Sequence, residues 1–379
     1  MPPPASARGL ALRALREVDA GARANVLVPE LLSASRLDQR DRHLVTELVY
    51  GTNRMQRACD WLTDRYTRGR IDSEVRAALR LGAYQLGWTR IPSHAAVSAT
   101  VAEVRGPGRT VVNAVLRRVA DDVDKGIVVW PDAATELSYP DWVVQRLSAD
   151  LGREPALAAL RTMNEPAAAT ARADGYIQDR ASQLTADHLR PFADGGTVLD
   201  VCAAPGGKAT ALAAGARLVV AADIAPPRVR MVATNAHRLQ AASVAPVVAD
   251  GRHPPFAEHG FDLVLVDASC TGLGVLRRRP DARWRVQPGD VDRLATLQKA
   301  LLASAAELVR PGGVLAYSVC TLTSSETAAI DRWAASQLPG FSPLAPPGRP
   351  WRNAGRGALL LPQEEGTDGM FLLTLRARS

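Results

Sequence analysis

The stretch "VLDVCAAPGGKA", residues 198–209, decides the fold of this chain. An apolar run ends near Asp200, a loop of small residues follows, and Lys208 opens a helical segment. Such a loop at the carboxyl end of a first strand lets a ligand approach the backbone closely. The stretch is not a phosphate-binding loop, because Ala209 stands where that motif needs Ser or Thr, and it lacks the G-x-G-x-x-G dinucleotide pattern. The remaining interpretation is a loop that binds a nucleoside-containing ligand of another kind.

The residues around this loop predict an α/β domain over residues 195–379. Short apolar, partly β-branched runs alternate there with helical stretches, which indicates a parallel sheet with right-handed crossovers. Strands are expected at residues 197–201, 217–223, 245–250, 261–268, 314–319 and 370–377.

The first part of the chain has a different pattern. Between about residues 8 and 125, apolar residues recur every three or four positions, and short polar or Gly/Pro breaks separate the segments. This pattern predicts an all-α bundle over residues 1–130, with an Asp cap before the segment that begins near residue 39. Cys59 lies within one of the expected helices and is interpreted as a buried apolar position. Residues 131–194 are expected to form linker helices.

Composition narrows the function classes. The chain has 379 residues, of which 47% are hydrophobic and 22% charged, as in ordinary soluble proteins. The sequence contains no run of about 18 apolar residues, so no membrane helix is expected. It also has no apolar signal segment at its start, and a cytoplasmic protein without membrane contact is therefore expected. Four cysteines do not suggest a disulfide framework there. The cysteines form no C-x-x-C pair and the six histidines are scattered, so no metal site is expected.

The net charge of +7 favours a polyanion partner such as RNA, although an Arg-rich composition alone could produce it. The sequence "VLRRRPDARWR", residues 275–285, concentrates five arginines and a tryptophan. Such a cluster suits phosphate contact and base stacking, and a solvated loop is the alternative. The residues predicted to contact RNA are Arg277, Arg278, Arg279 and Arg283.

Acidic residues close several of the expected strands. Asp223 lies 23 residues after Asp200, where a carboxylate can accept hydrogen bonds from ribose hydroxyls. Asp250 could meet an adenine amino group, and Asp267 ends the fourth strand. One strand-terminal Asp is often only a cap or turn residue. Four in series at one sheet edge, together with the glycine loop, indicate S-adenosylmethionine rather than NAD or ATP.

Two cysteines follow two of the strands. Cys270 lies in "VDASCTGLG" (266–274) and Cys320 in "LAYSVCTLTSSE" (315–326). A methyl sulfonium is already activated, so two thiols suggest an acceptor that is a poor nucleophile, such as carbon 5 of cytosine. A thiolate that adds to carbon 6 makes carbon 5 nucleophilic, and loss of the carbon 5 proton then allows elimination. Inert packing is the alternative. We expect Cys320, Cys270, Asp267 and Lys208 to carry this chemistry.

These blocks resemble a known family. "VLDVCAAPGGKATALAA", "DASCTGLGVLRRRPDARW" and "LAYSVCTLTSSE" are similar to the signature blocks of the RsmB/Sun (Fmu) family of RNA cytosine-5 methyltransferases, within the NOL1/NOP2/Sun superfamily. "DRHLVTELVYGTNRMQRACDWL" and "VVNAVLRRVA" resemble its NusB-like helical domain. The resemblance implies a NusB-like bundle followed by a Rossmann-like class I S-adenosylmethionine-dependent methyltransferase domain with a mostly parallel, seven-stranded sheet. It also implies RNA, in particular small-subunit ribosomal RNA, as the substrate.

The family's functional residues carry over by position. Cys320 matches the nucleophile, and Cys270 matches the cysteine needed for product release. The remaining matches are to the cofactor site: Cys202, Ala203, Ala204, Pro205, Gly206, Gly207, Lys208, Asp223, Asp250 and Asp267.

The chain also departs from the family pattern. Ser269 replaces the usual proline before the release cysteine, and Val319 and Thr321 flank Cys320 where Thr and Ser are common. Residues 164–183 compress a longer family segment that includes an RNA-contacting subdomain. This leaves two alternatives open: a repurposed methyltransferase for a non-ribosomal RNA, small molecule or peptide, and a non-enzymatic RNA-binding protein. The oligomeric state is not predicted.

Overall fold

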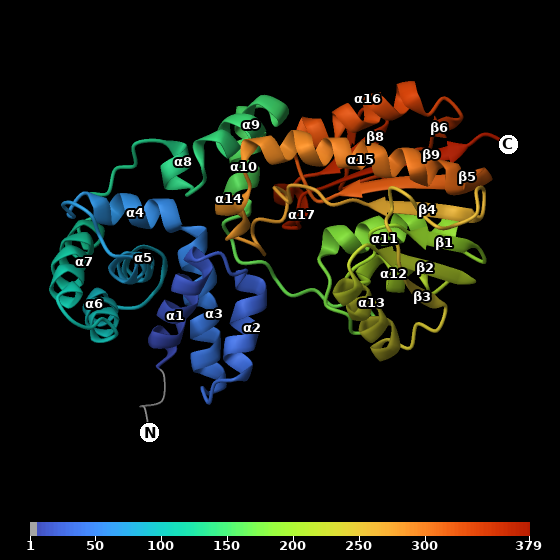
Figure 1. Cartoon of the computed structure of the whole chain (residues 1–379). Helices are drawn as coiled ribbons and strands as arrows, with labels where there is room; N and C mark the ends of the chain where they lie inside the picture. The colour runs from blue at the N-terminus through green and yellow to red at the C-terminus, as the bar shows by residue number, and fades with distance from the viewer. Residues whose placement is uncertain (1–5) are drawn as a thin grey trace. The chain divides into compact units, whose positions relative to one another are not determined.

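The computed structural model describes residues 6–379, and the chain divides into two compact units (Figure 1). The helical unit contains the chain up to Gln145 and, in addition, the segment Arg277–Arg285. The sheet unit contains Arg146–Leu276 and Val286–Ser379. The return of nine residues to the helical unit is a feature that the sequence pattern does not suggest.

The helical unit is an all-α bundle built around α5 (Ser73–Trp88), which Figure 1 shows nearly end-on. This helix buries residues on all of its faces, and it contacts α1, α3, α4, α6 and α7. The predicted cap is present, since the Asp38 side chain accepts a hydrogen bond from the Asp41 N–H. The other helices are α1 (Ala7–Asp19), α2 (Ala24–Ser33), α3 (Gln39–Arg54), α4 (Gln56–Asp64), α6 (Ser93–Ala102), α7 (Gly108–Asp124), α8 (Ala133–Glu136) and α14 (Ala282–Arg285).

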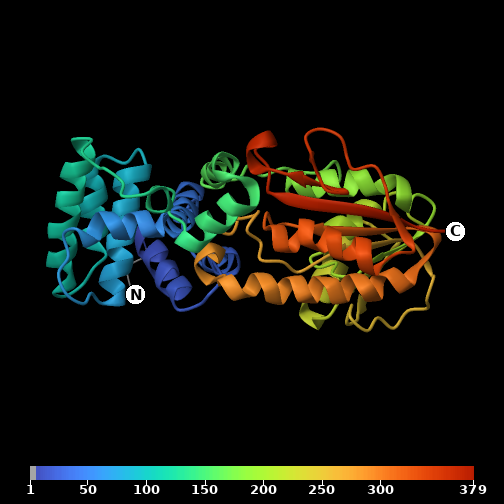
Figure 2. The same ribbon diagram turned by 90° about the horizontal axis from the view of Figure 1, so that it is seen from above.

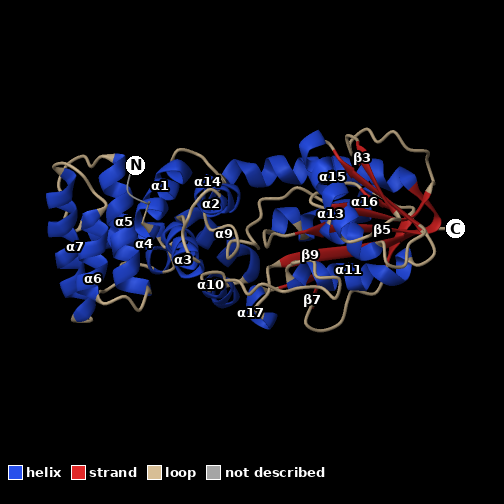
Figure 3. Ribbon diagram, turned by 90° about the horizontal axis from the view of Figure 1, so that it is seen from below, coloured by secondary structure: helices blue, strands red, loops and turns tan. Residues whose placement is uncertain are grey.

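The sheet unit is organised around one twisted sheet, coloured red in Figure 3. Its strand order is β3-β2-β1-β4-β5-β9-β8-β7, and β6 pairs with β9. The first five strands are parallel, and β9 runs antiparallel to β5. The strands are β1 (Thr197–Asp200), β2 (Leu218–Asp223), β3 (Val244–Val248), β4 (Phe261–Asp267), β5 (Val309–Val319), β6 (Phe341–Pro343), β7 (Arg352–Ala354), β8 (Gly357–Leu360) and β9 (Met370–Ala377).

Helices cover both faces of this sheet. Alternate strand residues point to opposite faces, so Val264 and Leu315 pack with α15 and α16, whereas Leu263 and Val314 pack with α11, α12 and α13. Figure 2 shows α15 and α16 side by side on one face. The helices are α9 (Asp141–Leu151), which begins in the helical unit, α10 (Arg153–Thr162), α11 (Arg180–Ala193), α12 (Gly207–Leu212), α13 (Pro226–Arg238), α15 (Pro288–Leu308), η1 (Ser324–Glu326), α16 (Ala328–Gln337) and α17 (Pro362–Glu365).

The predicted fold class is confirmed, and the six strands expected from the sequence are present. The predicted number of strands is wrong, because the described residues form a nine-stranded sheet rather than a seven-stranded one. Three strands were not expected from the sequence: β6 and β7 have three residues each and β8 has four, too few to produce a recognisable alternation of apolar and polar side chains.

Candidate active site

The small-residue loop between β1 and α12 has a backbone conformation that favours glycine at Gly206. Gly206 adopts φ +100°, a conformation that L side chains rarely adopt. A Cβ on Gly207 would lie 2.9 Å from the Gln178 amide nitrogen. Helix α13 supports the loop, since Arg228 donates to the Ala204 carbonyl and Asn235 to the Pro205 carbonyl. These hydrogen bonds from α13 therefore fix the backbone of the loop.

Two carboxylates lie beside this loop at the ends of adjacent strands. Asp200 is 1% exposed, and neither of its oxygens meets a donor with hydrogen-bond geometry, although the Cys202 N–H acts on it electrostatically. Burial, together with the negative charge of Asp267, raises the pKa of Asp200 to about 8. Asp223 accepts from the Ala225 N–H at 3.1 Å. A buried carboxyl group without a full set of hydrogen-bond partners fits a binding site in which a polar ligand supplies the missing partners.

Two other predicted cofactor residues have different surroundings. The Asp250 carboxylate pairs with the Arg252 guanidinium at 2.6 Å, and hydrogen bonds from Arg252 lower the pKa of Asp250 to about 2. Its acceptor capacity is thus partly taken up by its neighbour. Burial raises the pKa of the half-buried Cys202 thiol to about 12, so this thiol stays protonated.

Lys208 and Asp267 form an ion pair at the end of β4. The Lys208 Nζ lies 2.7 Å from the Asp267 Oδ2, and the lysine side chain is almost fully buried. Burial alone would lower the pKa of Lys208, but the Asp267 carboxylate outweighs it, and Cys320 and Asp200 add to the net rise. Lys208 is therefore a fixed positive charge that interacts with both Asp267 and Cys320.

The structure brings the two predicted catalytic cysteines together. Cys320 follows β5 directly and Cys270 follows β4 by three residues, and their sulfurs are 3.3 Å apart. The hydrogen bond with Cys320, followed by burial, raises the pKa of Cys270 well above its usual value. Cys270 therefore keeps its proton next to Cys320. Both sulfurs lie at the sheet edge that carries Asp200, Asp223 and Asp267, where α/β proteins bind their ligands.

The structure does not bring the four predicted RNA-contacting arginines to one surface. Arg283 is fully buried within the helical unit, 3.9 Å from the centre of the Tyr139 ring, and it donates to the Arg54 and Ser138 carbonyls. Arg277 is 6% exposed. The prediction that these two side chains contact RNA is therefore corrected, whereas Arg278 is half-buried and Arg279 is exposed.

Sequence reasoning missed several residues around the cysteines. Glu326, in η1, is fully buried and accepts hydrogen bonds from both cysteine loops. Gln298, on α15, donates to the Ser269 carbonyl and to Glu326. Its position could have been noticed, since it is a polar residue in the apolar stripe between Ala295 and Leu302. Ile224, 58% exposed directly after Asp223, is an apolar side chain at the ligand edge.

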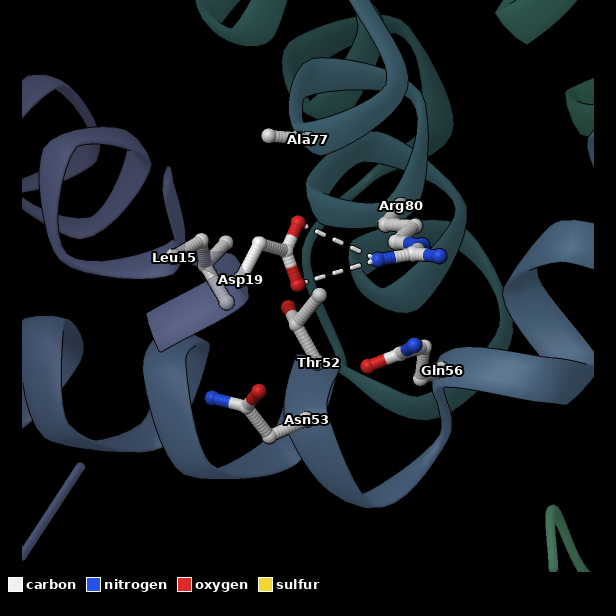
Figure 4. Close-up of a pocket in the computed structure, with 7 residues that line it drawn as sticks. All are labelled: Leu15, Asp19, Thr52, Asn53, Gln56, Ala77 and Arg80. Atoms are coloured by element: carbon white, nitrogen blue, oxygen red, sulfur yellow. Dashed lines mark hydrogen bonds and ion pairs between the residues drawn. The ribbon is translucent and has the colours of Figure 1, made fainter. Parts of the chain in front are cut away.

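A separate polar cluster in the helical unit has a structural role. Figure 4 shows a small pocket in which the Asp19 carboxylate pairs with Arg80. Arg80 also donates two hydrogen bonds of 2.8 Å to Asp60. One guanidinium thus satisfies two carboxylates from α1 and α4, which binds these helices to α5.

Two structural features are absent from the described residues, 6–379. None of the helices there is both long and apolar enough to cross a bilayer. No group of three or more acidic, histidine or cysteine side chains in that range could hold a metal ion.

The doubly wound sheet, the glycine loop at its first strand and the acidic strand ends define an S-adenosylmethionine-dependent methyltransferase domain joined to a helical bundle. The bundle matches the NusB family over residues 5–121, and residues 187–376 match the family described as 16S rRNA methyltransferase RsmB/F. The chain belongs to this RsmB/F methyltransferase family.

Relatives match along almost the whole chain. Ribosomal RNA small subunit methyltransferase B of Thermus thermophilus is 36% identical over 404 positions, which cover 97% of each chain. A Mycobacterium tuberculosis protein described as a methyltransferase is 36% identical over 445 positions, which cover 98% of this chain and 96% of that one. The second alignment has 445 positions against 379 residues, so at least 66 positions of that alignment are gaps in this chain.

Solved structures share the fold. The crystal structure of PH0851 superposes with a TM-score of 0.77 at 22% identity, and the match covers 97% of this chain and 98% of that one. A methyltransferase homolog protein from Pyrococcus horikoshii has a TM-score of 0.55 at 22% identity, over 66% of this chain and all of the other.

Proposed function

We propose that this protein methylates carbon 5 of a cytosine in small-subunit ribosomal RNA, through a covalent bond between Cys320 and carbon 6. The observation that carries this proposal is the 3.3 Å separation of the two sulfurs beside the Lys208–Asp267 ion pair. A methyltransferase that only aligns a nucleophilic acceptor needs no thiol pair. The relatives named as ribosomal RNA small subunit methyltransferase B support the choice of RNA.

The two sulfurs have different surroundings, and these suit different steps. Cys320 interacts with the Lys208 ammonium, which favours its thiolate, so Cys320 adds to carbon 6 of the ring. Cys270 keeps its proton, so it is the thiol that assists departure of Cys320 from the product. Asp267, held by Lys208, accepts hydrogen bonds from the cytosine edge.

The cofactor site is formed by the loop 202–208 with Asp223, Asp250 and Asp267. S-adenosylmethionine, when bound, supplies an electrophilic methyl group. Asp223 would accept the ribose hydroxyls, and the exposed Ile224 and Val248 side chains offer an apolar surface to the adenine ring. After methyl transfer Cys270 gives its proton to the departing Cys320 sulfur and takes up the carbon 5 proton, while the electron pair of the carbon 5–hydrogen bond forms the ring double bond and breaks the bond between carbon 6 and sulfur. Ring and thiol are then regenerated.

The first test uses the release step. A Cys270→Ala variant incubated with total cellular RNA and S-adenosylmethionine is expected to accumulate a protein–RNA adduct, with Cys320 as the linked residue in the mass spectrum. The double variant Cys270→Ala, Cys320→Ala is the matched control and is expected to form none. If no cellular RNA is retained by the single variant, the covalent mechanism is wrong.

A second candidate function is methylation of a different substrate, for example a non-ribosomal RNA. The gap of at least 66 positions relative to the mycobacterial relative favours it, as does the compression that we infer for residues 164–183. Mapping of 5-methylcytosine in ribosomal RNA from cells with and without the gene separates the two. Loss of one methylated cytosine supports ribosomal RNA, which would also place the activity in the cytoplasm. An unchanged ribosomal pattern together with a different trapped RNA supports the second candidate.

A further inference from the structure

Glu326 is the last residue of η1 (Ser324–Glu326) and follows Cys320 by six positions. Its side chain is fully buried, and its carboxylate accepts five hydrogen bonds. A buried carboxylate is costly unless donors surround it. The observation that calls for an explanation is that these donors come from three separate parts of the chain: the loop after β4, the loop after β5, and α15.

The carboxylate joins the residues that directly follow the two cysteines. Thr271, next to Cys270, donates its N–H to Oε1 at 2.8 Å and its hydroxyl to Oε2 at 2.6 Å. Thr321, next to Cys320, donates its hydroxyl to Oε2 at 3.1 Å, and the two threonine hydroxyls lie 2.9 Å from each other. Both loops are therefore connected to Oε2, and the loop that carries Cys270 is also connected to Oε1.

Further contacts fix the carboxylate itself. Gln298 donates to Oε1 at 3.1 Å and to the Ser269 carbonyl at 3.0 Å, so α15 holds both the acid and the residue before Cys270. Asp150, from α9, accepts hydrogen bonds from the N–H and the hydroxyl of Ser324, at the start of η1. The position of Glu326 is thus determined by two helices, and neither of them carries a cysteine.

We propose that Glu326 is a positioning residue for the catalytic cysteines, and that its carboxylate sets the separation between the Cys270 and Cys320 sulfurs by fixing their two loops to each other. The catalytic part of this role rests on the function proposed above. Two backbone hydrogen bonds compete with it: the Ala268 N–H donates to the Ser318 carbonyl and the Gly274 N–H donates to the Cys320 carbonyl, each at 3.0 Å. They leave the segment between Ala268 and Gly274, which carries Cys270, to be fixed by Thr271.

The separation can be measured without RNA or cofactor. In a glutathione redox buffer the two thiols exchange with oxidised glutathione to give the Cys270–Cys320 disulfide and two molecules of reduced glutathione. The equilibrium constant equals the effective concentration of one thiol at the other. This effective concentration rises when the two loops hold the sulfurs close together. Thiol alkylation followed by peptide mass spectrometry gives the disulfide fraction at each glutathione ratio.

The Glu326→Ala variant is expected to lower this effective concentration at least tenfold. Glu326→Gln is expected to stay within about threefold of wild type, because its amide oxygen still accepts from Thr271 and Gln298 and its NH₂ can donate to the threonine hydroxyls. Asp331→Ala is the matched control. Asp331 is also a buried acid in the sheet unit, but its donors belong to Arg356, so no change is expected.

An unchanged effective concentration in a folded Glu326→Ala protein would overturn the proposal, since the backbone bonds at Ala268 and Gly274 would then suffice. If Glu326→Ala does not fold, Thr321→Val replaces it. Valine keeps the shape of threonine and removes the hydroxyl that reaches Glu326, so the same tenfold decrease is expected and an unchanged value contradicts the proposal. A decrease in this titration without any methylation of RNA would support the positioning role while rejecting the proposed function.

Discussion

The Asp200 carboxyl group ends β1 without a full set of hydrogen-bond partners, and its pKa is raised to about 8. An acid whose pKa is higher in the folded chain stabilises the fold when protonated. Its contribution is complete below the ordinary pKa near 4 and is lost as the pH rises through 8. In the unliganded protein, Asp200 therefore makes the sheet unit less stable with rising pH.

We predict that Asp200→Asn removes this pH dependence. The difference in thermal unfolding midpoint between the variant and wild type should increase from pH 5 to pH 8.5 in favour of the variant. In the pH range where Asp200 is ionised only in the unfolded chain, each pH unit lowers the free energy of unfolding by about 1.4 kcal/mol at most. Asp187→Asn, on an exposed face of α11, should show a constant difference. A pH-independent difference for Asp200→Asn would mean that Asp200 is ionised in the fold.

Lys208 allows a second prediction at the scale of single residues. Its ammonium pairs with Asp267 and interacts with Cys320, so removal of the charge should leave Cys320 less reactive. Lys208→Met is expected to slow alkylation of Cys320 by iodoacetamide at pH 7.5 by about tenfold, because the thiolate is the reacting form. Lys208→Arg, which keeps the charge, should stay within about threefold of wild type. Equal rates in wild type and Lys208→Met would show that the ion pair does not activate the thiol.

At the scale of elements, the turn from β1 into α12 is the feature on which ligand binding depends. Gly206 has φ +100°, and a Cβ there would lie 3.3 Å from the Val232 side chain and 3.4 Å from its Cα. A side chain at this position costs about 1–2 kcal/mol of backbone strain. The close contact with Val232 is relieved if the loop moves away from α13, and that movement would displace the loop backbone from the ligand.

We therefore predict that Gly206→Ala weakens binding of S-adenosylhomocysteine at least tenfold in calorimetry and lowers the unfolding midpoint of the sheet unit. Gly289→Ala is the matched control, because a Cβ there meets no atom within 4 Å and its φ is not positive. This control should bind the ligand as wild type does. Wild-type affinity in Gly206→Ala would show that the loop is more adaptable than its glycines suggest.

These elements also show what the sequence can and cannot predict. The strands β1 to β5 and β9 were predictable because apolar runs of this length, separated by helical stretches, have few other folds available. The acidic strand ends were predictable because parallel strands end at one edge. The link from Glu326 to Thr271 spans 55 residues and depends on how two loops and a helix meet. No local pattern in "TLTSSE" reveals that partner.

At the scale of the whole molecule, the segment Arg277–Arg285 belongs to the helical unit although it lies between two elements of the sheet unit. Its arginine-rich composition predicts an exposed, RNA-facing loop. Arg283 instead packs on Tyr139, and Trp284 donates its indole N–H to the Asn53 carbonyl at 2.7 Å. Composition fails here because backbone carbonyls and an aromatic ring can take the place of water or phosphate around a buried guanidinium.

The two ends of this segment should therefore differ in function. Arg283→Met leaves the carbonyls of Arg54 and Ser138 without this donor, at a cost of about 2 kcal/mol or more. We predict faster amide hydrogen exchange over residues 53–58 and 137–141 in this variant. Arg279→Met, at an exposed position, should leave exchange unchanged. It should instead weaken RNA binding two- to tenfold and reduce the slope of log affinity against log salt by about one.

The salt slope decides between the two roles, because a lost phosphate contact changes the number of released counterions whereas loosened packing does not. Burial lowers the pKa of Arg283 to about 10, so the side chain stays charged at neutral pH and could bind phosphate if the segment left the bundle. In that case Arg283→Met would reduce the slope as much as Arg279→Met does. An unchanged slope with faster exchange would mean that Arg283 contributes to RNA binding only indirectly. It would do so by holding the segment that carries Arg279 in place.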